Sequence, residues 1–534
     1  MKRMLLLGDE AIAQGAIDAG LSGVYAYPGT PSTEITEYIQ RSKAARERGV
    51  HSDWSANEKT AMEAALGMSY AGKRAMACMK HVGLNVAADG FINAGITGAN
   101  GGLIVVAADD PSMHSSQNEQ DSRFYGKFAL IPMIEPADQQ EAYHAMSYGF
   151  DLSEKFGTPV LVRITTRLAH SRSGVELREP RDANALTLPQ DKRQFVLLPS
   201  IARRNYQSLL GKQAGFEEDS EQSPFNSYTE GPDRTLGIIA CGIAHNYLME
   251  NFQDGCPHPV LKIGQYPAPR NMIRTILKSC DKVLILEDGA PFLEEQIRGL
   301  LDESYAILGR LDGTVPRAGE LNPNIVATAL GRTVETGKPK AEIVKPRPPE
   351  LCPGCPHIDS YNALNEVLRE LEPGRVFSDI GCYTLGALEP FNAINTCVDM
   401  GASITMAKGA ADAGLFPAVA VIGDSTFTHS GMTGLLDAII ENSPITVMIV
   451  DNETTGMTGG QTSSARGKLE DICIGLGVPK DHVRVVEPLK KNHDDNMRVI
   501  KEELYYEGVS VIIERRECIQ TLKISKMLEK EAAK

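Results

Sequence analysis

Positive charge is scarce in this sequence, and a long hydrophobic run is missing. Among 534 residues, 54 Lys and Arg stand against 69 Asp and Glu, so the formal net charge is −15. Because nucleic acids and anionic membranes attract basic surfaces, neither is expected as a partner. The apolar run in MKRMLLLGDE is interrupted by Gly8, Asp9 and Glu10 before it reaches the length of a signal sequence or a spanning helix. We therefore expect a cytoplasmic protein.

Tryptophan occurs once, and closely spaced cysteines are rare. Of the ten cysteines, only Cys352 and Cys355 form a Cys-x-x-Cys pair. A long cytosolic chain does not normally carry a disulfide framework, so most cysteines should be buried, and the close pair points to metal. The hydrophobic content of 42% and the 49 glycines are ordinary for a soluble α/β enzyme. The length favours two to four domains.

Apolar strand-like runs alternate with helical patterns in two long blocks, 1–175 and 351–534. This alternation predicts an α/β fold with doubly wound, mostly parallel sheets. Residues 176–235 lose the pattern and are interpreted as a surface excursion. A compact α/β unit is expected at 236–335, and the Lys- and Pro-rich residues 336–350 are interpreted as a linker. Strands are expected at 23–27, 75–79, 102–108, 159–164, 235–240, 260–263, 283–287, 376–378, 418–422, 445–450, 482–485 and 509–513.

The most informative stretch contains VIGDSTFTHSG and IVDNETTGMTGGQ. Asp424 follows one apolar strand and Asn452 follows the next, so both should lie at the ligand-binding edge of a parallel sheet. Their oxygens, with the main-chain carbonyl of Thr454, suit Mg²⁺ bound to a diphosphate. We interpret the motif as a thiamine diphosphate site. The alternative is an Asp that caps a helix and an Asp-Asn turn without metal. Further cofactor contacts are expected from Gly423, Ser425, Met457 and Thr458.

Thiamine also needs a carboxylate against its aminopyrimidine ring, because the protein tunes the chemistry that the cofactor carries. Glu58 is the candidate, since it begins a helix directly after a strand-end loop. Glu63 is the competitor, one turn into the same helix. The alternative role of Glu58 is that of a favourable acid in a first helical turn.

Four cysteines of the last block can bind metal together. LCPGCPH supplies Cys352 and Cys355, and the other two, Cys382 and Cys518, follow predicted strands. Four thiolates can hold a [4Fe–4S] cluster or Zn²⁺, and a redox pair is a further possibility. From the spacing alone, either distant partner can be replaced by Cys397 or Cys473.

Further motifs occur in order along the chain: YPGTPSTEI, NEKTAMEAALGMSYAG, KHVGLNVAAD, ADDPSMHSSQNEQDSR, LCPGCPH, DIGCYTLG and MGASITMAKG. Together with GDS and DNETTGMTGGQ, they resemble the large subunit of the indolepyruvate:ferredoxin oxidoreductases, which are thiamine-dependent 2-oxoacid:ferredoxin oxidoreductases. The resemblance covers nearly the whole chain. It implies a pyrimidine-binding-type domain at 1–175, a transketolase C-terminal-like domain at 236–335 and a diphosphate-binding-type domain at 351–534.

The resemblance implies oxidative decarboxylation of an arylpyruvate with coenzyme A to an acyl-CoA, with electrons leaving singly. It implies that Glu58 faces the aminopyrimidine and that Thr30 lies near the reacting atoms. It also implies Mg²⁺ at Asp424 and Asn452 and a [4Fe–4S] cluster at Cys352, Cys355, Cys382 and Cys518. The implied partners are a small beta subunit and a separate ferredoxin or ferredoxin-like subunit, in a dimer of heteromers.

Two departures from the family pattern bear on these expectations. The chain stops at EKEAAK, without the ferredoxin-like tail that family members commonly carry, so another protein is expected to relay the electrons. Where pyruvate-specific relatives have an Arg, this chain has Asp109 and Asp110, which disfavours pyruvate. Met457 suits a larger apolar substrate. Loop residues that can meet a substrate carboxylate or proton are His81, His114, Gln117, Asn118 and Arg123. The alternative for each is a loop residue satisfied by the protein's own contacts.

Two other functions fit parts of the pattern. A non-oxidative 2-oxoacid decarboxylase or carboligase needs no electron relay, and the missing tail is its best support. A non-catalytic subunit that keeps the fold is the third hypothesis. The presence of Glu58, Asp424 and Asn452 speaks against it.

Overall fold

The structure is a computed structural model of the chain. It describes residues 3–27, 29–55, 57–114, 116, 118–252, 255–298, 328, 333, 337, 341–345, 349–455, 461–463 and 465–522. Met1–Ala290 and Leu351–Lys534 form one compact unit, and Pro291–Glu350 form a second. In the second unit we describe the helix α13 (Phe292–Arg298). All further elements belong to the first unit.

The first block builds a seven-stranded sheet in the order β13-β6-β7-β5-β4-β2-β3. Its strands are parallel except for the antiparallel pair of β13 with β6. Strands such as β5 are buried on both faces, which explains their continuous apolar sequence. The strands are β2 (Gly23–Ala26), β3 (His51–Trp54), β4 (Ala75–Lys80), β5 (Leu103–Asp109), β6 (Met133–Ile134), β7 (Val160–Thr165) and β13 (Gln265–Tyr266).

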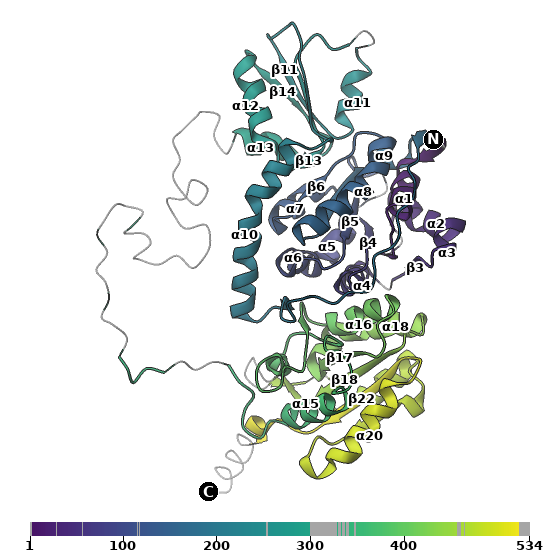
Figure 1. Cartoon of the computed structure of the whole chain (residues 1–534), viewed down its shortest axis with the longest axis vertical. Helices are drawn as coiled ribbons and strands as arrows, with labels where there is room; N and C mark the ends of the chain where they lie inside the picture. Colours follow the sequence, from purple (N-terminus) through teal and green to yellow (C-terminus); the bar gives the residue numbers. More distant parts are fainter. Residues whose placement is uncertain are drawn as a thin grey trace. The chain divides into compact units, whose positions relative to one another are not determined.

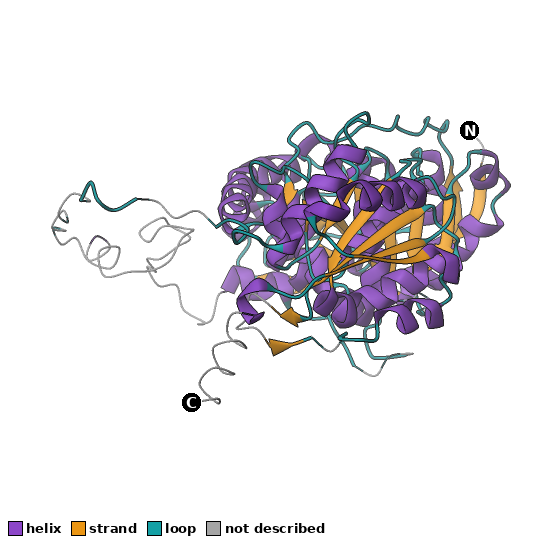
Figure 2. Cartoon of the chain, turned by 90° about the horizontal axis from the view of Figure 1, so that it is seen from below, coloured by secondary structure: helices purple, strands orange, loops and turns teal. Residues whose placement is uncertain are grey.

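Helices lie on both sides of the strands in the view of Figure 2, and in the first block they pack against the seven-stranded sheet. One face carries an apolar core that includes residues of α1, α2 and α8 together with alternate residues of the strands. Helix α4 contacts β2, β4 and β5 as well. The helices of this block are α1 (Gly8–Asp18), α2 (Thr33–Arg41), α3 (Lys43–Glu47), α4 (Glu58–Tyr70), α5 (His81–Val86), α6 (Ala88–Thr97), α7 (Ser122–Ala129), α8 (Gln139–Phe156) and α9 (Thr166–His170).

The last block builds a five-stranded sheet in the order β15-β17-β18-β22-β21, and all its pairs are parallel. The strands are β15 (Val376–Ser378), β17 (Ala418–Gly423), β18 (Ile445–Asp451), β21 (Val483–Val486) and β22 (Ser510–Arg515). The helices are α15 (Pro356–Val367), α16 (Ala402–Asp412), α17 (Asp424–Thr426), α18 (Met432–Ile440), α19 (Leu469–Leu476) and α20 (His493–Leu504). The predicted α/β fold with parallel sheets is confirmed.

Between the two blocks in sequence, the chain forms a four-stranded sheet in the order β10-β12-β11-β14. This sheet belongs to the first compact unit. Only β10 runs antiparallel to its neighbour among these described strands. The elements are β10 (Ser227–Thr229), β11 (Gly237–Cys241), β12 (Val260–Ile263), β14 (Val283–Leu286), α11 (Ala244–Met249) and α12 (Arg270–Ser279). The domain boundaries drawn from the sequence stay a prediction.

The predicted surface excursion holds a long helix, α10 (Pro199–Glu221), which is labelled in Figure 1. Its Asp219 accepts a hydrogen bond from Tyr148 at 2.7 Å, so the helix packs on the first block. Nearby, β8 (Arg172–Glu176) pairs with β1 (Arg3–Leu7), and β9 (Phe195–Val196) pairs with β16 (Thr396–Cys397). The interpreted surface excursion therefore contains regular elements that the sequence pattern did not indicate, and its assignment as an excursion between domains stays a prediction. Much of the predicted linker at 336–350 lies outside the described residues.

Helices α4 and α16 join the two parallel-sheet blocks (Figure 1). They approach closely because glycines lie at the crossing. A Cβ atom on Gly67 would lie 2.4 Å from the carbonyl oxygen of Met406, and one on Gly409 would lie 2.2 Å from that of Ala64. This contact places the strand-end loops of both blocks within one compact unit.

Among the helices of the described ranges, none has both the length and the apolar character needed to cross a membrane.

Candidate functional site

Asp424 and Asn452 lie at the carboxyl ends of neighbouring parallel strands. The two strands, β17 and β18, are paired up to Gly423 and Val450. Asp424 is 2% exposed, and its Oδ2 atom has no hydrogen-bond partner among the described residues. Burial and the charge of Asp451 raise the pKa of Asp424 to about 6. A buried carboxylate oxygen without a donor fits a cation as its partner.

The neighbours of these two residues also suit a diphosphate site. Asn452 is buried, and its Oδ1 accepts a hydrogen bond from the backbone of Thr454 at 3.1 Å, which leaves one lone pair on that oxygen. Position 423 has room only for a glycine, because a Cβ atom there would lie 2.5 Å from the ring of Tyr383. Ser425 follows Asp424 in the short helix α17. Met457 and Thr458 lie outside the described residues.

Three candidates of the first block lie at one edge of its sheet. Thr30 follows β2, His81 follows β4 and Glu58 comes shortly after β3; these three parallel strands are neighbours. The Nε2 atom of His81 lies 3.0 Å from the carbonyl oxygen of Asn118, and its Nδ1 atom is buried without a partner in the described part of the chain. Glu58 packs against Gly83. A Cβ atom on Gly83 would lie 2.6 Å from the Cγ atom of Glu58.

The structure separates Glu58 from its competitor Glu63. Glu63 is 1% exposed, forms an ion pair with Lys59 and accepts a hydrogen bond from Thr405 at 2.9 Å. It therefore belongs to the packing between α4 and α16. Lys59 also donates to Asp399 at 2.9 Å, so the residue next to Glu58 ties this helix start to the last block.

The four predicted cysteines come together at the start of the last block. Burial and the sulfurs of Cys352 and Cys518 raise the pKa of Cys355 to about 11. Burial and the sulfurs of Cys355 and Cys518 raise the pKa of Cys382 to about 12. Thiols with raised pKa values are poor ligands until a metal stabilises the thiolates. Cys473, by contrast, is buried in α19 with Glu470 rather than a cysteine as its charged neighbour.

The spacing of the four sulfurs is wider than zinc needs. A tetrahedral Zn²⁺ site with Zn–S bonds of about 2.3 Å places its sulfurs about 3.8 Å apart. Across the described residues, no three cysteine sulfurs lie within 4.8 Å of one another. A four-iron cluster tolerates wider spacing because each thiolate binds a different iron.

The cysteine site and the predicted diphosphate site share a side chain. The Nδ2 atom of Asn452 lies 3.8 Å from the sulfur of Cys382 and 3.4 Å from Nε2 of His357. The same Nε2 atom lies 3.3 Å from the sulfur of Cys382, and burial lowers the pKa of His357 to about 4, so its imidazole is neutral. The backbone of Cys518 donates to the carbonyl of Asn452 at 3.1 Å. The two sites are therefore contiguous.

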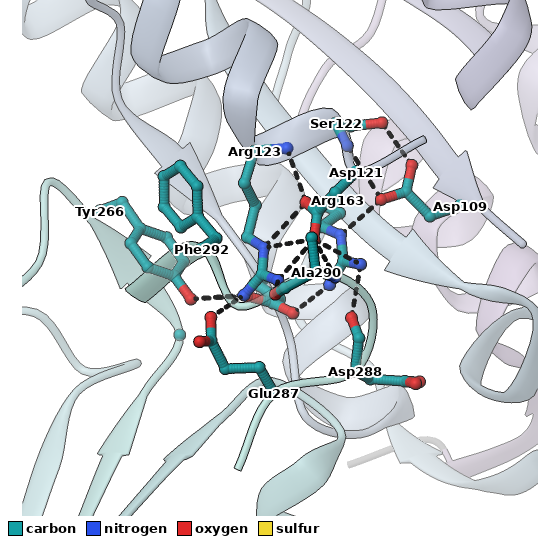
Figure 3. Close-up of polar contacts among 12 residues, drawn as sticks. Asp109, Asp121, Ser122, Arg123, Arg163, Tyr266, Glu287, Asp288, Ala290 and Phe292 are labelled. Carbon is teal, nitrogen blue, oxygen red and sulfur yellow. Dashed lines mark hydrogen bonds and ion pairs between the residues drawn. The ribbon is translucent and has the colours of Figure 1, made fainter. Parts of the chain in front are cut away.

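The prediction that Arg123 is a loop residue able to meet a substrate is wrong. It is fully buried and pairs with Asp121 at 2.5 Å and with Glu287 at 2.9 Å, as Figure 3 shows. Arg163 in the same network binds Asp109 at 2.6 Å. Because these charges are satisfied within the chain, Arg123 is not available to a substrate. Of the remaining loop candidates, His114 is exposed and Gln117 lies outside the described residues.

Sequence reasoning missed three residues that support the site. His357 lies in the quoted LCPGCPH motif, and Lys59 follows Glu58, so their positions were visible but their contacts were not. Tyr383 donates a hydrogen bond to Asp379, a buried carboxyl whose pKa is raised to about 7 by its burial. The Tyr383 ring also packs beneath Gly423. No motif spacing signals that contact.

Two family models match the chain. The model described as "Pyruvate flavodoxin/ferredoxin oxidoreductase, thiamine diP-bdg" covers residues 14–224. The model described as "Thiamine pyrophosphate enzyme, C-terminal TPP binding domain" covers residues 379–513. The first range includes Thr30, Glu58 and His81, and the second includes Asp424 and Asn452.

Curated relatives match over almost the full length. The Archaeoglobus fulgidus protein named indolepyruvate oxidoreductase subunit IorA is 40% identical, over 97% of this chain and 86% of its own. The protein of that name from Pyrococcus abyssi is 39% identical over the same shares. Among solved structures, the thiamine diphosphate-dependent 4-hydroxybenzoylformate decarboxylase of Rhodococcus jostii matches with a TM-score of 0.50 and 14% identity, over 96% of this chain and 99% of that one. This structural likeness bears on the fold alone.

Proposed function

The chain belongs to the indolepyruvate oxidoreductase subunit IorA family, and we propose that it oxidatively decarboxylates an arylpyruvate-type 2-oxoacid with coenzyme A to an acyl-CoA. We propose that electrons leave singly through a [4Fe–4S] cluster to a ferredoxin-like acceptor. The observation that carries this proposal is the side chain of Asn452, which lies between the predicted diphosphate site and the sulfur of Cys382.

The described residues of the two strand ends fit thiamine diphosphate and Mg²⁺. Asp424 offers a buried oxygen without a partner, and Asn452 offers a carbonyl oxygen beside it in the fold. The main-chain carbonyl of Thr454 is the third proposed ligand. Glu58, at the start of α4, would hold a proton on the aminopyrimidine. When bound, thiamine diphosphate supplies the carbon nucleophile and the electron sink that decarboxylation needs.

The cysteine site fits an electron acceptor. Cys352, Cys355, Cys382 and Cys518 would hold the [4Fe–4S] cluster, which supplies one-electron chemistry when bound. Cys355 is buried and the other three cysteines are partly exposed. His357 and Asn452 place polar nitrogens beside Cys382. Such neighbours tune the potential of a cluster.

The residues near the first-block edge support a larger substrate than pyruvate. Asp109 is paired with Arg163, and Asp110 accepts hydrogen bonds from Thr166 at 2.7 Å and from Ser116 at 2.8 Å. Both acids are thus part of the protein's own hydrogen bonding. Thr30 and His81 remain the proposed groups near the reacting atoms, and Met457 remains the proposed contact of an aromatic side chain.

Further proteins complete the proposed reaction. We propose a small beta subunit, a separate ferredoxin or ferredoxin-like subunit, and a dimer of heteromers in the cytoplasm. The formal net charge of −15 agrees with partners other than nucleic acid.

The test is an anaerobic assay of the chain with its small partner subunit. Indolepyruvate or phenylpyruvate is supplied with coenzyme A, Mg²⁺, thiamine diphosphate and an artificial one-electron acceptor. We expect an aryl-acetyl-CoA and two reduced acceptor equivalents per CO₂. Release of aldehyde without acceptor reduction would instead establish the non-oxidative decarboxylase, and no turnover of any 2-oxoacid would support the non-catalytic subunit.

A further inference from the structure

Two carboxylates and an imidazole meet at a place that the proposed reaction does not use. Asp9 in α1, Glu34 in α2 and His170 at the end of α9 each bring one ligand atom within 4.8 Å of the others. The Nε2 atom of His170 lies 3.7 Å from Oε2 of Glu34. None of the proposed cofactor or cluster residues belongs to this set.

Asp9 is fully buried and has no hydrogen-bond donor. It is 0% exposed, and neither of its oxygens has a partner within the described chain. Oε2 of Glu34 is also buried without a hydrogen-bond partner there, and its described neighbour is the imidazole of His170 at 3.7 Å. Burying an ionised carboxylate without a donor or a cation costs several kcal/mol. The space between the two carboxyl groups must therefore hold a proton or a cation.

Acidic side chains gather around Asp9. Glu34 and Glu10 are its acidic neighbours. Glu10 is itself occupied, because it accepts a hydrogen bond from the backbone of Leu7 at 2.8 Å at the helix start. The imidazole of His170 is the basic group that the fold brings to this pair.

The ligand positions are fixed by close helix packing. A Cβ on Gly8 would lie 2.2 Å from the carbonyl oxygen of Leu168, so the start of α1 lies directly against α9. Asp9 and His170 each follow one of these two residues closely in sequence. The packing therefore fixes the backbone positions of Asp9 and His170 relative to each other, which favours metal binding.

We propose that Asp9, Glu34 and His170 bind one divalent transition-metal cation, with Mn²⁺ and Zn²⁺ as the candidates. Two carboxylate oxygens and one imidazole nitrogen form a mixed donor set, which suits these cations better than Mg²⁺ or Ca²⁺, whose sites are built from oxygen. The cation balances the charge of the two carboxylates. Three protein ligands leave further coordination positions for water or a small anion.

One of the three proposed ligands borders a cavity. His170 lines a cavity of about 890 Å³, together with Thr165, Arg167, Tyr247 and other residues. The side chain of His170 is 37% exposed, so a cation bound there can exchange with solvent. The site is thus open on the side of His170 and closed on the side of Asp9.

A comparable set elsewhere in the described chain does not carry the same inference. His51, Asp412 and Glu441 also bring ligand atoms within 4.8 Å of one another. Lys408, however, already lies 3.1 Å from Asp412 and 2.8 Å from Glu441. Its ammonium group supplies the cation there, whereas none of the ion pairs given for the described residues joins a Lys or an Arg to Asp9.

The experiment is a titration of the full chain with Mn²⁺, followed by EPR of the free ion. The protein is first treated with chelator, and thiamine diphosphate is left out so that the Asp424 site lacks its phosphate oxygens. We expect one tightly bound Mn²⁺ per chain and at least a tenfold weaker affinity in Asp9→Asn and in His170→Ala. Zn²⁺ should displace the bound Mn²⁺.

Two control variants make the result specific. His114→Ala removes a histidine that lines the same cavity but lies outside the set, and it should bind Mn²⁺ as the wild type does. Asp424→Asn should also retain the ion. Because His170 lies at the surface, His170→Ala remains informative if Asp9→Asn does not fold. Unchanged Mn²⁺ affinity in His170→Ala overturns the proposal.

A wild-type chain that binds neither Mn²⁺ nor Zn²⁺ also overturns it. If the wild type binds neither ion and Asp9→Asn has a larger free energy of unfolding than the wild type, Asp9 and Glu34 share a proton instead. None of these results bears on the oxidation of 2-oxoacids, so this proposal and the proposed function fail separately.

Discussion

At the scale of single residues, the site depends on which of several similar side chains is free to act. Glu58 and Glu63 lie in one helix, but Glu63 is engaged by Lys59 and Thr405. The sequence predicts Asn452 only as a metal ligand and gives His357 no role, yet in the fold both lie beside the sulfur of Cys382. The chemistry proposed for each residue follows from these contacts.

The first prediction separates the two glutamates. Glu58→Gln should lower turnover by about 10²- to 10⁴-fold, because it removes a proton-transferring group while keeping the side chain's size. Exchange of the thiazolium C2 proton, followed by NMR, should slow in parallel. Glu63→Gln should keep that exchange rate and lower the free energy of unfolding by about 1–3 kcal/mol, since it loses a buried polar partner. Equal exchange rates in wild type and Glu58→Gln would refute the assignment.

The second prediction separates two cysteines. Cys518→Ala should lose bound iron, because Cys518 lies with Cys355 and Cys382. Cys473→Ala should keep the iron, because Cys473 lies buried in α19 beside Glu470. Iron and acid-labile sulfide are measured after anaerobic purification. The opposite pattern of iron loss would assign the fourth ligand to Cys473.

At the scale of secondary-structure elements, the crossing of α4 and α16 holds together the two strand-end edges of the site. The helices approach through glycines, and the ion pair of Lys59 with Asp399 reinforces the contact between the blocks. A change at the crossing should therefore affect both stability and cofactor binding.

The third prediction concerns that crossing. Gly409→Ala should lower the free energy of unfolding by about 1–3 kcal/mol, because the new Cβ would meet the backbone of α4 at 2.2 Å. Gly475→Ala in α19 is the control, since a Cβ there has no described neighbour within 4 Å. Denaturant unfolding measures both. The control should be neutral or slightly stabilising because alanine favours a helix. Equal destabilisation by the two changes would contradict the packing account.

The fourth prediction concerns pH. Burial raises the folded pKa of Glu441 from its ordinary 4.5 to about 7. Between these values the carboxyl is ionised in the unfolded chain and protonated in the folded one, so unfolding is favoured as pH rises. This shift should cost up to about 3 kcal/mol of stability between pH 4.5 and pH 7, and the cost should then level off.

Glu441→Gln is the variant that measures this effect. Its free energy of unfolding should fall less steeply than that of the wild type between pH 5 and pH 7, by urea titration at each pH. Glu372→Gln, a change at an exposed site, should follow the wild-type curve. A wild type whose stability rises over this range relative to Glu441→Gln would reverse the sign and contradict the account.

At the scale of the whole molecule, the sequence predicts most of the fold because parallel strands buried on both faces have unmistakable apolar runs. Strand β5, with LIVVAAD, is such a case. Helix α10 was missed because its buried residues are few and widely spaced, at Ile201, Asn205, Leu209, Phe216 and Ser220, within a charged sequence. Its stability comes from tertiary packing rather than from its own pattern.

The candidate site was predictable where motif residues follow strands, as Asp424 and Asn452 do. It was not predictable where contacts join distant segments. The cysteine spacing left Cys473 open as a substitute for Cys518, and only the fold places Cys518 beside Asn452. Arg123 was misplaced because its partner Glu287 lies far along the chain.

The fifth prediction follows from the contiguity of the two sites, and low-temperature EPR of one anaerobic turnover tests it most directly. The chain and its small partner subunit are mixed with Mg²⁺, thiamine diphosphate and indolepyruvate and then frozen. A reduced iron–sulfur signal should appear with substrate in the wild type and in Cys473→Ala, and it should be missing in Cys518→Ala and Asp424→Asn. Consumption of indolepyruvate by an iron-free wild-type chain, with no such signal, would contradict the account.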